Sequence, residues 1–164
     1  MGRSRQVRAG LCLAVAGLLA GGAVLVVRAG EPAGPAVTAA PRGDAPECAR
    51  IARGYPSSLG GQERSGPRLA GVAAWGEGAV VLRCGLEPPA PTVDRCLNVN
   101  GVDWVLEDAK FRDGRKVLIT YGRDPAVELA ITDRAAQTDT ALVELSRAVQ
   151  PIRQIAKCVG DTDV

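Results

Sequence analysis

The amino-acid sequence predicts an α+β fold: an antiparallel sheet of four or five strands with a short N-terminal helix and a longer C-terminal helix, preceded by one transmembrane helix. Three observations lead to this prediction. Residues 9–27 are an uncharged apolar run, residues 79–131 contain short hydrophobic segments separated by turn signals, and residues 138–152 repeat apolar side chains at helical spacing. The 164 residues suffice for one compact domain with an accessory segment, and are too few for two ordinary domains.

The apolar run from Ala9 to Val27 predicts a membrane anchor. As a helix it would span about 28 Å, close to the hydrocarbon thickness of a bilayer. Three arginines precede it and only Arg28 follows closely, so the positive-inside rule leaves residues 1–8 in the cytoplasm and sends the C-terminal domain outside. We expect a single-pass protein of the cell membrane. The alternative is a signal peptide cleaved at Ala29, which would make the protein secreted.

The exported part divides into a linker and one domain. Residues 28–46 contain four prolines among small residues and predict an extended linker. Residues 47–164 are expected to form an extracytoplasmic α+β domain.

Hydrophobic patterning within residues 79–131 predicts the sheet. Residues 79–82 predict a buried strand, and residues 96–106 predict one bulged strand or two strands joined by the Asn100-Gly101 turn. After a second turn at Asp113-Gly114, alternate residues from Val117 to Tyr121 share one face, and residues 127–131 alternate again. This pattern predicts an antiparallel meander.

Two helices are expected to flank the meander. Residues 47–53 predict a short helix that ends before Pro56, and residues 60–68 predict a loop. A second helix is expected to begin at Thr138 or Asp139, and Pro151 is expected to kink or split it. Its predicted apolar stripe consists of Leu142, Leu145, Val149 and Ile152.

Composition excludes several functional classes. Hydrophobic residues make up 46% of the chain and charged residues 23%, which is typical of a globular protein. Aromatic residues supply only 3%, and residues 30–164 carry 16 basic and 18 acidic groups, so we expect no nucleic-acid partner. The chain has no histidine, which excludes Ser-His-Asp and Cys-His catalysis and histidine metal sites.

Four cysteines in an exported domain predict two disulfides. Among the three possible pairings we favour Cys84 with Cys96, which closes a proline-rich loop, and Cys48 with Cys158, which ties the first helix to the last. Zinc binding and thiol redox chemistry are the competing interpretations. Neither fits, because no two of these cysteines have CxxC spacing and an oxidising compartment favours the bridged form.

The sequence contains no recognisable catalytic motif. Gly76-Glu77-Gly78 begins like a dinucleotide fingerprint, but Val81 occupies the place of the third glycine and the segment leads into a strand. We interpret it as a turn. Carboxylates gather at Asp103, Glu107 and Asp108, which leaves glycosidase-like acid and base roles as a formal alternative.

One ion pair is predicted inside the sheet. Arg83 follows Val80, Val81 and Leu82, so its guanidinium is expected to be partly buried and to need a partner. Asp103, on the strand expected beside it, is the first candidate. A structural pair is favoured over a ligand-binding pair.

Four short motifs resemble the actinobacterial domain of unknown function 3515, over roughly residues 47–158. The motifs are Ala74-Trp75-Gly76, Leu82-Arg83-Cys84-Gly85, Asn100-Gly101-Val102-Asp103-Trp104 and Gly122-Arg123-Asp124-Pro125. Two positions depart from the family pattern: Tyr55, where leucine is usual, and Gly78, where proline is common. The resemblance implies an exported, membrane-anchored protein and transfers no established activity.

These observations predict a cell-envelope protein whose external disulfide-bonded domain binds or scaffolds an envelope protein or a cell-wall component. The candidate binding residues are Arg83, Asp103, Trp104 and Arg123. No cofactor or metal ligand is predicted. The alternative function is a cell-wall-directed hydrolase that uses carboxylates such as Asp103 and Glu107.

Overall fold

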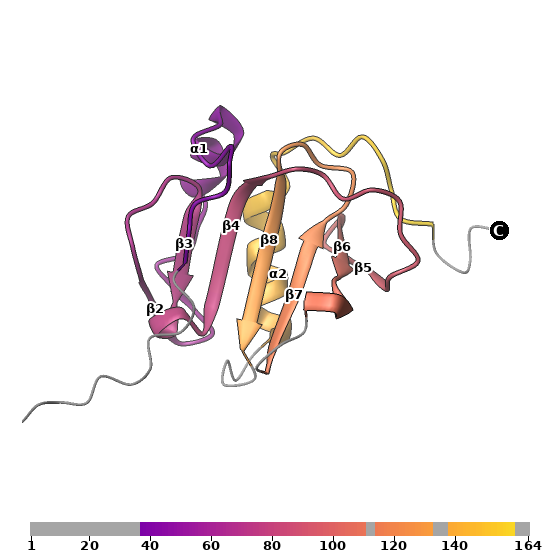
Figure 1. Ribbon diagram of the computed structural model, residues 1–164. Coiled ribbons are helices and arrows are strands. Elements are labelled where there is room, and N and C mark those ends of the chain that lie inside the picture. Colours follow the sequence, from indigo (N-terminus) through magenta and orange to yellow (C-terminus); the bar gives the residue numbers. More distant parts are fainter. Residues whose placement is uncertain (1–36, 111–113, 133–137, 160–164) are drawn as a thin grey trace, which may run out of the picture. The chain divides into compact units, whose positions relative to one another are not determined.

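A computed structural model describes residues 37–110, 114–132 and 138–159 of the chain (Figure 1). The membrane-spanning helix expected over residues 9–27 and most of the expected linker lie outside these residues. Within the described ranges, no helix is both long enough and apolar enough to cross a bilayer.

The described chain contains two α-helices, eight strands and two short 3₁₀ helices. In order these are α1 (Pro46–Ala52), β1 (Ser58–Leu59), β2 (Gln62–Ser65), β3 (Val72–Trp75), η1 (Gly76–Gly78), β4 (Val80–Leu86), β5 (Cys96–Val99), β6 (Val102–Leu106), η2 (Asp108–Lys110), β7 (Arg115–Thr120), β8 (Ala126–Thr132) and α2 (Thr138–Val149).

The eight strands form one antiparallel sheet in the order β1-β2-β3-β4-β8-β7-β6-β5. The prediction of four or five strands is therefore wrong. The strands that were missed, β1 to β3, lie N-terminal to the predicted meander. β1 has only two residues, and β2 is polar and largely exposed within the segment 60–68 that was expected to be a loop.

Two meanders meet at the centre of the sheet. β1 to β4 form one and β5 to β8 form the other, and β8 pairs with β4 along most of its length. The chain therefore leaves β4 at the sheet centre and crosses to the far edge before β5 begins. β5 is an edge strand, separated from β4 by β6, β7 and β8.

Both helices lie where the sequence indicates. Pro46 occupies the first turn of α1, where its missing N–H costs no hydrogen bond. α2 ends at Val149, two residues before Pro151, so the proline follows the helix instead of kinking it. Ile152 still reaches the core although it lies beyond α2.

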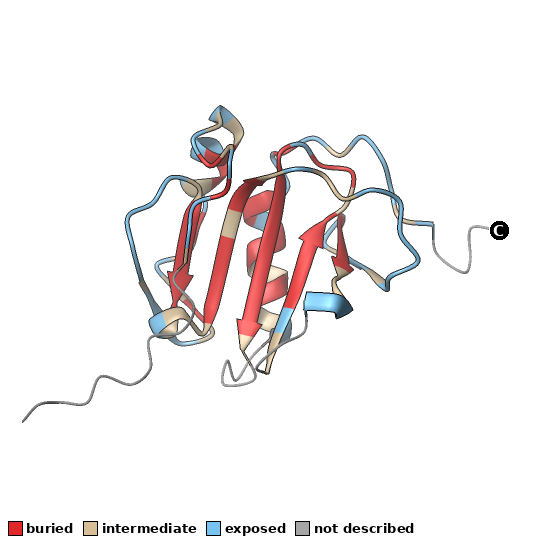
Figure 2. Ribbon diagram, viewed as in Figure 1, coloured by how far each residue is buried: buried red, intermediate tan, exposed pale blue. Residues whose placement is uncertain are grey.

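The main core lies between the sheet and the helices. α2 runs along one face of the sheet (Figure 1), and the strands it covers are coloured as buried in Figure 2. Trp75, Trp104, Leu82, Leu129 and Leu145 are among the largest side chains removed from solvent there. The opposite sheet face carries two smaller apolar clusters, which are centred on β4 with β8 and on β6 with β7.

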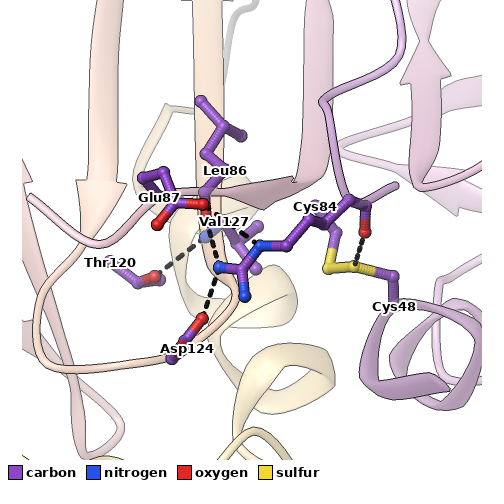
Figure 3. A network of polar contacts seen from close by, with 8 residues as sticks. Cys48, Cys84, Leu86, Glu87, Thr120, Asp124 and Val127 are labelled. Atoms are coloured by element: carbon purple, nitrogen blue, oxygen red, sulfur yellow. Dashed lines mark hydrogen bonds and ion pairs between the residues drawn. A yellow bond between two sulfur atoms is a disulfide. The ribbon is translucent and has the colours of Figure 1, made fainter. Parts of the chain in front are cut away.

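The C-terminal part of the predicted linker packs against the domain through Arg42. Figure 3 labels its side-chain contacts Leu86, Glu87 and Asp124. Its backbone N–H donates to the Gly85 carbonyl at 3.0 Å, and its guanidinium donates to the Leu86 carbonyl and to Asp124 and lies 3.4 Å from a Glu87 carboxylate oxygen. The bond to Asp124 is the largest cause that raises the pKa of Arg42. Gly85 is required here, because its φ is 108° and a side chain would collide with the Arg42 backbone.

Candidate binding groove beside the Cys96–Cys158 disulfide

A groove of about 670 Å³ lies along β5, between the loop that precedes this strand and the C-terminal segment. Two other hollows are smaller: one of about 350 Å³ between α1 and α2, and one of about 540 Å³ at the β2–β3 loop. The groove along β5 contains a predicted site residue, Asp103. Its lining consists of Thr92, Val93, Asp94, Arg95, Cys96, Asn98, Asp103, Lys157, Cys158 and Val159.

Asp103 forms the floor of the groove and is only 5% exposed. Its carboxylate accepts hydrogen bonds from the Asn98 side-chain amide at 2.5 Å, the Gln154 side-chain amide at 2.7 Å and the backbone N–H of Cys158 at 2.9 Å. Three protein donors therefore occupy most of its acceptor capacity. Asp103 positions the C-terminal segment against β5 and β6.

The Cys96–Cys158 disulfide forms one wall of the groove, and both of its cysteines are partly exposed. The second disulfide, Cys48–Cys84, lies in the main core, where its cysteines are 1% and 0% exposed. The four cysteines within the described residues are thus all bridged.

The predicted pairing of Cys84 with Cys96 and of Cys48 with Cys158 is wrong. Four strand spacings separate β4 from β5, which amounts to about 19 Å at roughly 4.8 Å per spacing. The two bridges that form have Cα–Cα distances of 5.6 and 6.3 Å. The loop between Cys84 and Cys96 crosses the sheet, so it does not bring its ends together.

The rim of the groove carries exposed charges and exposed apolar side chains. Neither Arg95 nor Lys157 forms an ion pair with any described residue. Val93 is fully exposed, and Val159 is 77% exposed. Asp94 adds an exposed carboxylate to the same lining, so the rim offers charges of both signs and apolar contacts to a ligand.

Arg123 does not line the groove. Its side chain fastens residues 150–154, which follow α2, to the turn at Gly101, and we call this arrangement the Arg123 clamp. Its guanidinium, 4% exposed, donates to the carbonyls of Gln150 and Ile152 just after α2, to the Gly101 carbonyl and to the Gln154 side chain. Burial lowers the pKa of Arg123, and the charge of Asp103 opposes that shift. Since Gln154 also donates to Asp103, Arg123 and Asp103 belong to one polar network.

Trp104 points to the opposite side of the sheet from the groove. Its indole N–H donates to the Ser146 hydroxyl of α2 at 2.9 Å, and both residues are 0% exposed. Trp104 therefore holds α2 against β6 and does not line the groove.

Arg83 pairs with Glu128 and not with Asp103, so the predicted ion pair is wrong. Arg83 Nη1 lies 3.0 Å from Glu128 Oε1, and Lys110 contacts the second carboxylate oxygen at 3.2 Å. β8, which was not expected beside β4, supplies Glu128 directly opposite Arg83. Asp103 lies on β6, three strand spacings from β4.

The carboxylates proposed for hydrolysis do not converge. Asp103 and Glu107 lie four residues apart along β6 and its extension, which corresponds to about 13 Å. Glycosidase carboxyl pairs are roughly 5 to 9.5 Å apart. Glu107 instead contacts Lys110 at 2.9 Å. Among the described residues, no three His, Cys, Asp or Glu side chains gather in a way that could hold a metal ion.

Sequence reasoning missed Arg42, Glu128 and Gln154. Arg42 lies in a proline-rich segment, and Glu128 lies in the middle of a strand that otherwise reads as apolar. A charged residue within an apolar strand indicates that its charge is paired inside the fold. Of the three missed residues, Glu128 could therefore have been identified from the sequence. Nothing in the local sequence distinguishes Arg42 or Gln154.

The fold and groove define a class: a small, disulfide-stapled domain of one antiparallel sheet covered by helices, with no convergent catalytic groups among its described residues. The chain belongs to the family described as "Protein of unknown function (DUF3515)", which matches residues 9–157. The matched range includes the apolar segment 9–27 as well as the folded domain. No curated protein and no solved structure matches the chain.

Proposed function

We propose that this protein is an exported, non-catalytic binding or scaffolding protein of the cell envelope, and that the groove beside Cys96–Cys158 is its binding site. The observation that carries the proposal is the combination of exposed charged and apolar side chains along the groove with a buried carboxylate, Asp103, that is already occupied by protein donors. Such a surface is suited to bind a ligand, whereas Asp103 is poorly placed to act as a general acid or base.

Two features support export. Two disulfides in a domain of this size are typical of proteins that fold in an oxidising compartment. The uncharged segment 9–27, preceded by three arginines, has the charge asymmetry of an export signal, and it falls within the family match. The segment either remains in the membrane as an anchor or is removed by cleavage at Ala29.

Protease treatment of cells tests the location. With the wall permeabilised and the membrane intact, protease should degrade the domain of residues 47–164 while a cytoplasmic control protein survives. Recovery of a chain that begins near residue 30 from the medium would identify the cleaved form. A domain that stays protected until the membrane is lysed would overturn the proposed location.

Site-specific photo-crosslinking tests the binding role. A photoreactive amino acid at Val93, on the rim of the groove, should give discrete adducts in the source cells. The same amino acid at Lys116, which is exposed on β7 outside the groove, is the matched control and should give none. The absence of adducts from Val93, Arg95 and Lys157 alike would contradict the proposed site.

A further inference from the structure

The hollow at the β2–β3 loop differs in charge from the other two hollows. Its volume is about 540 Å³, and it is lined by two arginines, one serine and otherwise glycine and apolar residues: Arg64, Ser65, Gly66, Pro67, Arg68, Leu69, Ala70, Val72 and Ala73. The groove along β5 includes Asp94 and Asp103 beside its cations, and the hollow between α1 and α2 includes Glu144. Of the three, the hollow at the β2–β3 loop alone has cations and no carboxylate in its lining.

The two arginines of this hollow lack an acidic partner. Neither Arg64 nor Arg68 forms an ion pair with any described residue. The register of β2 with β3 places Arg64 on the sheet face that also carries Ala73, whereas strand alternation directs Glu63 to the other face. Glu77 of η1 bonds to the lining through its backbone N–H and is not itself part of it. Both guanidinium groups are therefore available to an anionic ligand.

The local structure holds the lining in place. The Arg64 guanidinium lies over the Tyr55 ring, 5.6 Å from its centroid, and this cation–π contact orders the side chain without neutralising its charge. Gly71 fixes the end of the loop, because its φ is 69° and a Cβ atom there would lie 2.5 Å from the Cys84 carbonyl oxygen. The Cys84 N–H in turn donates to the Gly71 carbonyl at 2.7 Å. A lining that is already ordered lowers the entropic cost of binding a ligand.

Two unpaired guanidinium groups favour an oxyanion with two negative charges. A carboxylate has one charge and two oxygens, which a single guanidinium can engage through two parallel hydrogen bonds. A phosphate monoester carries about −1.5 to −2 charges at pH 7 and three terminal oxygens, so it can accept from two arginines at once. The volume of about 540 Å³ is in the range of sites for small organic ligands, and most of the remaining lining is apolar.

We infer that the hollow at the β2–β3 loop binds a phosphate monoester, with Arg64 and Arg68 on the phosphate and Leu69 on the organic part of the ligand. Leu69 is 38% exposed and lies next to Arg68 in the lining. The hollow lies toward the opposite edge of the sheet from the groove along β5, so the inference does not depend on the proposed function and can fail separately. A soluble ester and a lipid head group present the same phosphate chemistry, which the experiments must distinguish.

Binding of phenyl phosphate to the full chain, in uncharged detergent micelles at constant ionic strength, tests the inference. We expect saturable binding, with amide chemical-shift changes centred on residues 64–73. Phenyl sulfate has the same ring but one negative charge, so it should bind more weakly by about ten-fold or more. Absence of phenyl phosphate binding, or equal binding of phenyl sulfate, would overturn the inference.

Substitution of the arginines tests the position of the site. Arg64→Gln and Arg68→Gln should each weaken phenyl phosphate binding by about ten-fold or more, because each removes one guanidinium from the phosphate. Lys116→Gln removes an exposed cation on β7, outside the hollow, and should leave binding unchanged. Both arginines are exposed, so thermal melts should show that the three variants stay folded. Equal affinities in all three variants would overturn the assignment to this hollow.

Replacement of Leu69 tests the apolar contact. Leu69→Ser should weaken binding of phenyl phosphate and leave binding of inorganic phosphate unchanged, because only the first ligand has an organic part. Inorganic phosphate should also bind the unaltered chain more weakly than phenyl phosphate does. Equal losses for both ligands in Leu69→Ser would overturn the role of this side chain.

Competition with a short-chain lipid identifies the source of the phosphate. Dihexanoyl phosphatidic acid, a phosphate monoester, is added to the same micelles with bound phenyl phosphate. Displacement at a lower concentration than unlabelled phenyl phosphate requires would assign the site to a lipid head group, and displacement only at a higher concentration would assign it to a soluble ester. Dihexanoyl phosphatidylcholine, whose phosphate is a diester, is the control. Equal displacement by this diester would overturn the preference for a monoester.

Discussion

Arg83 and Glu128 face each other directly on the adjacent strands β4 and β8, with Arg83 Nη1 3.0 Å from Glu128 Oε1. The side chains differ in exposure, 27% for Arg83 and 9% for Glu128, and Lys110 contacts the other carboxylate oxygen. The buried carboxylate is thus held between two cations. The Arg83–Glu128 ion pair joins β4 to β8, where the two meanders meet. Changes to this pair therefore test the stability of the centre of the sheet.

We predict that Glu128→Leu costs about 3 kcal/mol of unfolding free energy, because it leaves Arg83 without its partner in a partly buried place. Arg83→Met should cost less, about 1 to 2 kcal/mol, because Lys110 still compensates Glu128. The double variant should cost less than the sum of the two. Chemical denaturation of all four chains measures this coupling.

The control is a second double-mutant cycle, which combines Arg83→Met with Asp103→Asn. These positions are about 14 Å apart across three strand spacings, so their effects should add to within about 0.5 kcal/mol. Coupling in this cycle together with additivity between Arg83 and Glu128 would contradict the observed pairing.

Replacement of Arg123 should destabilise the domain whether or not the positive charge is kept. Its guanidinium donates to four acceptors on two segments, Gly101 and residues 150–154, and a single ammonium cannot reproduce that geometry. We expect Arg123→Lys and Arg123→Met each to cost about 3 kcal/mol. Arg153→Met removes an exposed arginine nearby and should change stability by less than about 0.5 kcal/mol. Thermal melts of the three variants check this, and a fully stable Arg123→Lys would refute the clamp.

Local patterns predicted the elements that carry strong periodicity. The short helix after Pro46, the alternation after Asp113-Gly114 and the apolar stripe of α2 depend on residues that are near each other in sequence, and the structure contains elements at all three places. β2 escaped prediction because its residues are polar, exposed and rich in charge. Such a strand is stabilised by pairing with its neighbours and not by its own side chains, so hydrophobic patterning cannot reveal it.

Local sequence patterns could not predict which strands pair with each other across the sheet. The meander rule places consecutive strands side by side, which would put Cys96 near Cys84 and Asp103 near Arg83. Instead β8 returns to the sheet centre and pairs with β4, so Cys96 and Asp103 lie far from these residues. The disulfide error and the ion-pair error therefore have one cause. Arg83 and Asp103 were singled out as charged groups among apolar strand residues, but the partners of such groups depend on strand order.

The two disulfides should differ in their sensitivity to reduction. Cys96 and Cys158 are partly exposed beside the groove, whereas Cys48 and Cys84 are enclosed in the core. Limiting dithiothreitol on the native chain should therefore open Cys96–Cys158 first. Differential alkylation followed by mass spectrometry measures the order, and earlier alkylation of Cys48 and Cys84 would contradict the burial argument.

Each bridge is also expected to contribute to stability. On the chain-entropy relation, loops closed by sequence separations of 36 and 62 residues correspond to about 4 kcal/mol each. The double variant Cys48→Ala/Cys84→Ala should lose more than this, because it also leaves a cavity in the core. Cys96→Ala/Cys158→Ala should lose no more than the entropic contribution. The denaturation midpoints of the two double variants measure these losses. A larger loss in Cys96→Ala/Cys158→Ala would refute the assignment of Cys48–Cys84 to the core.

Tyr55 has a hydroxyl that is buried with no hydrogen-bond partner among the described residues. Its ring packs edge-on against Trp75, with centroids 6.1 Å apart. Burial raises the pKa of Tyr55 above its ordinary value of 10.0, and the nearby charge of Arg64 opposes this only in part. Because the folded state favours the neutral phenol, its contribution to stability is complete below about pH 10 and is lost as the pH rises further.

Tyr55→Phe should therefore keep or raise stability at neutral pH, by up to about 1 kcal/mol, since it removes an unsatisfied buried hydroxyl. It should also reduce the fall in melting temperature between pH 9 and 11, at roughly the range where an ordinary phenol ionises. Tyr121→Phe, at a partly exposed position, is the matched control and should leave that fall unchanged. Melting curves across this pH range measure both effects. A loss of stability in Tyr55→Phe at neutral pH would mean that the hydroxyl has a partner, and that result would refute the prediction.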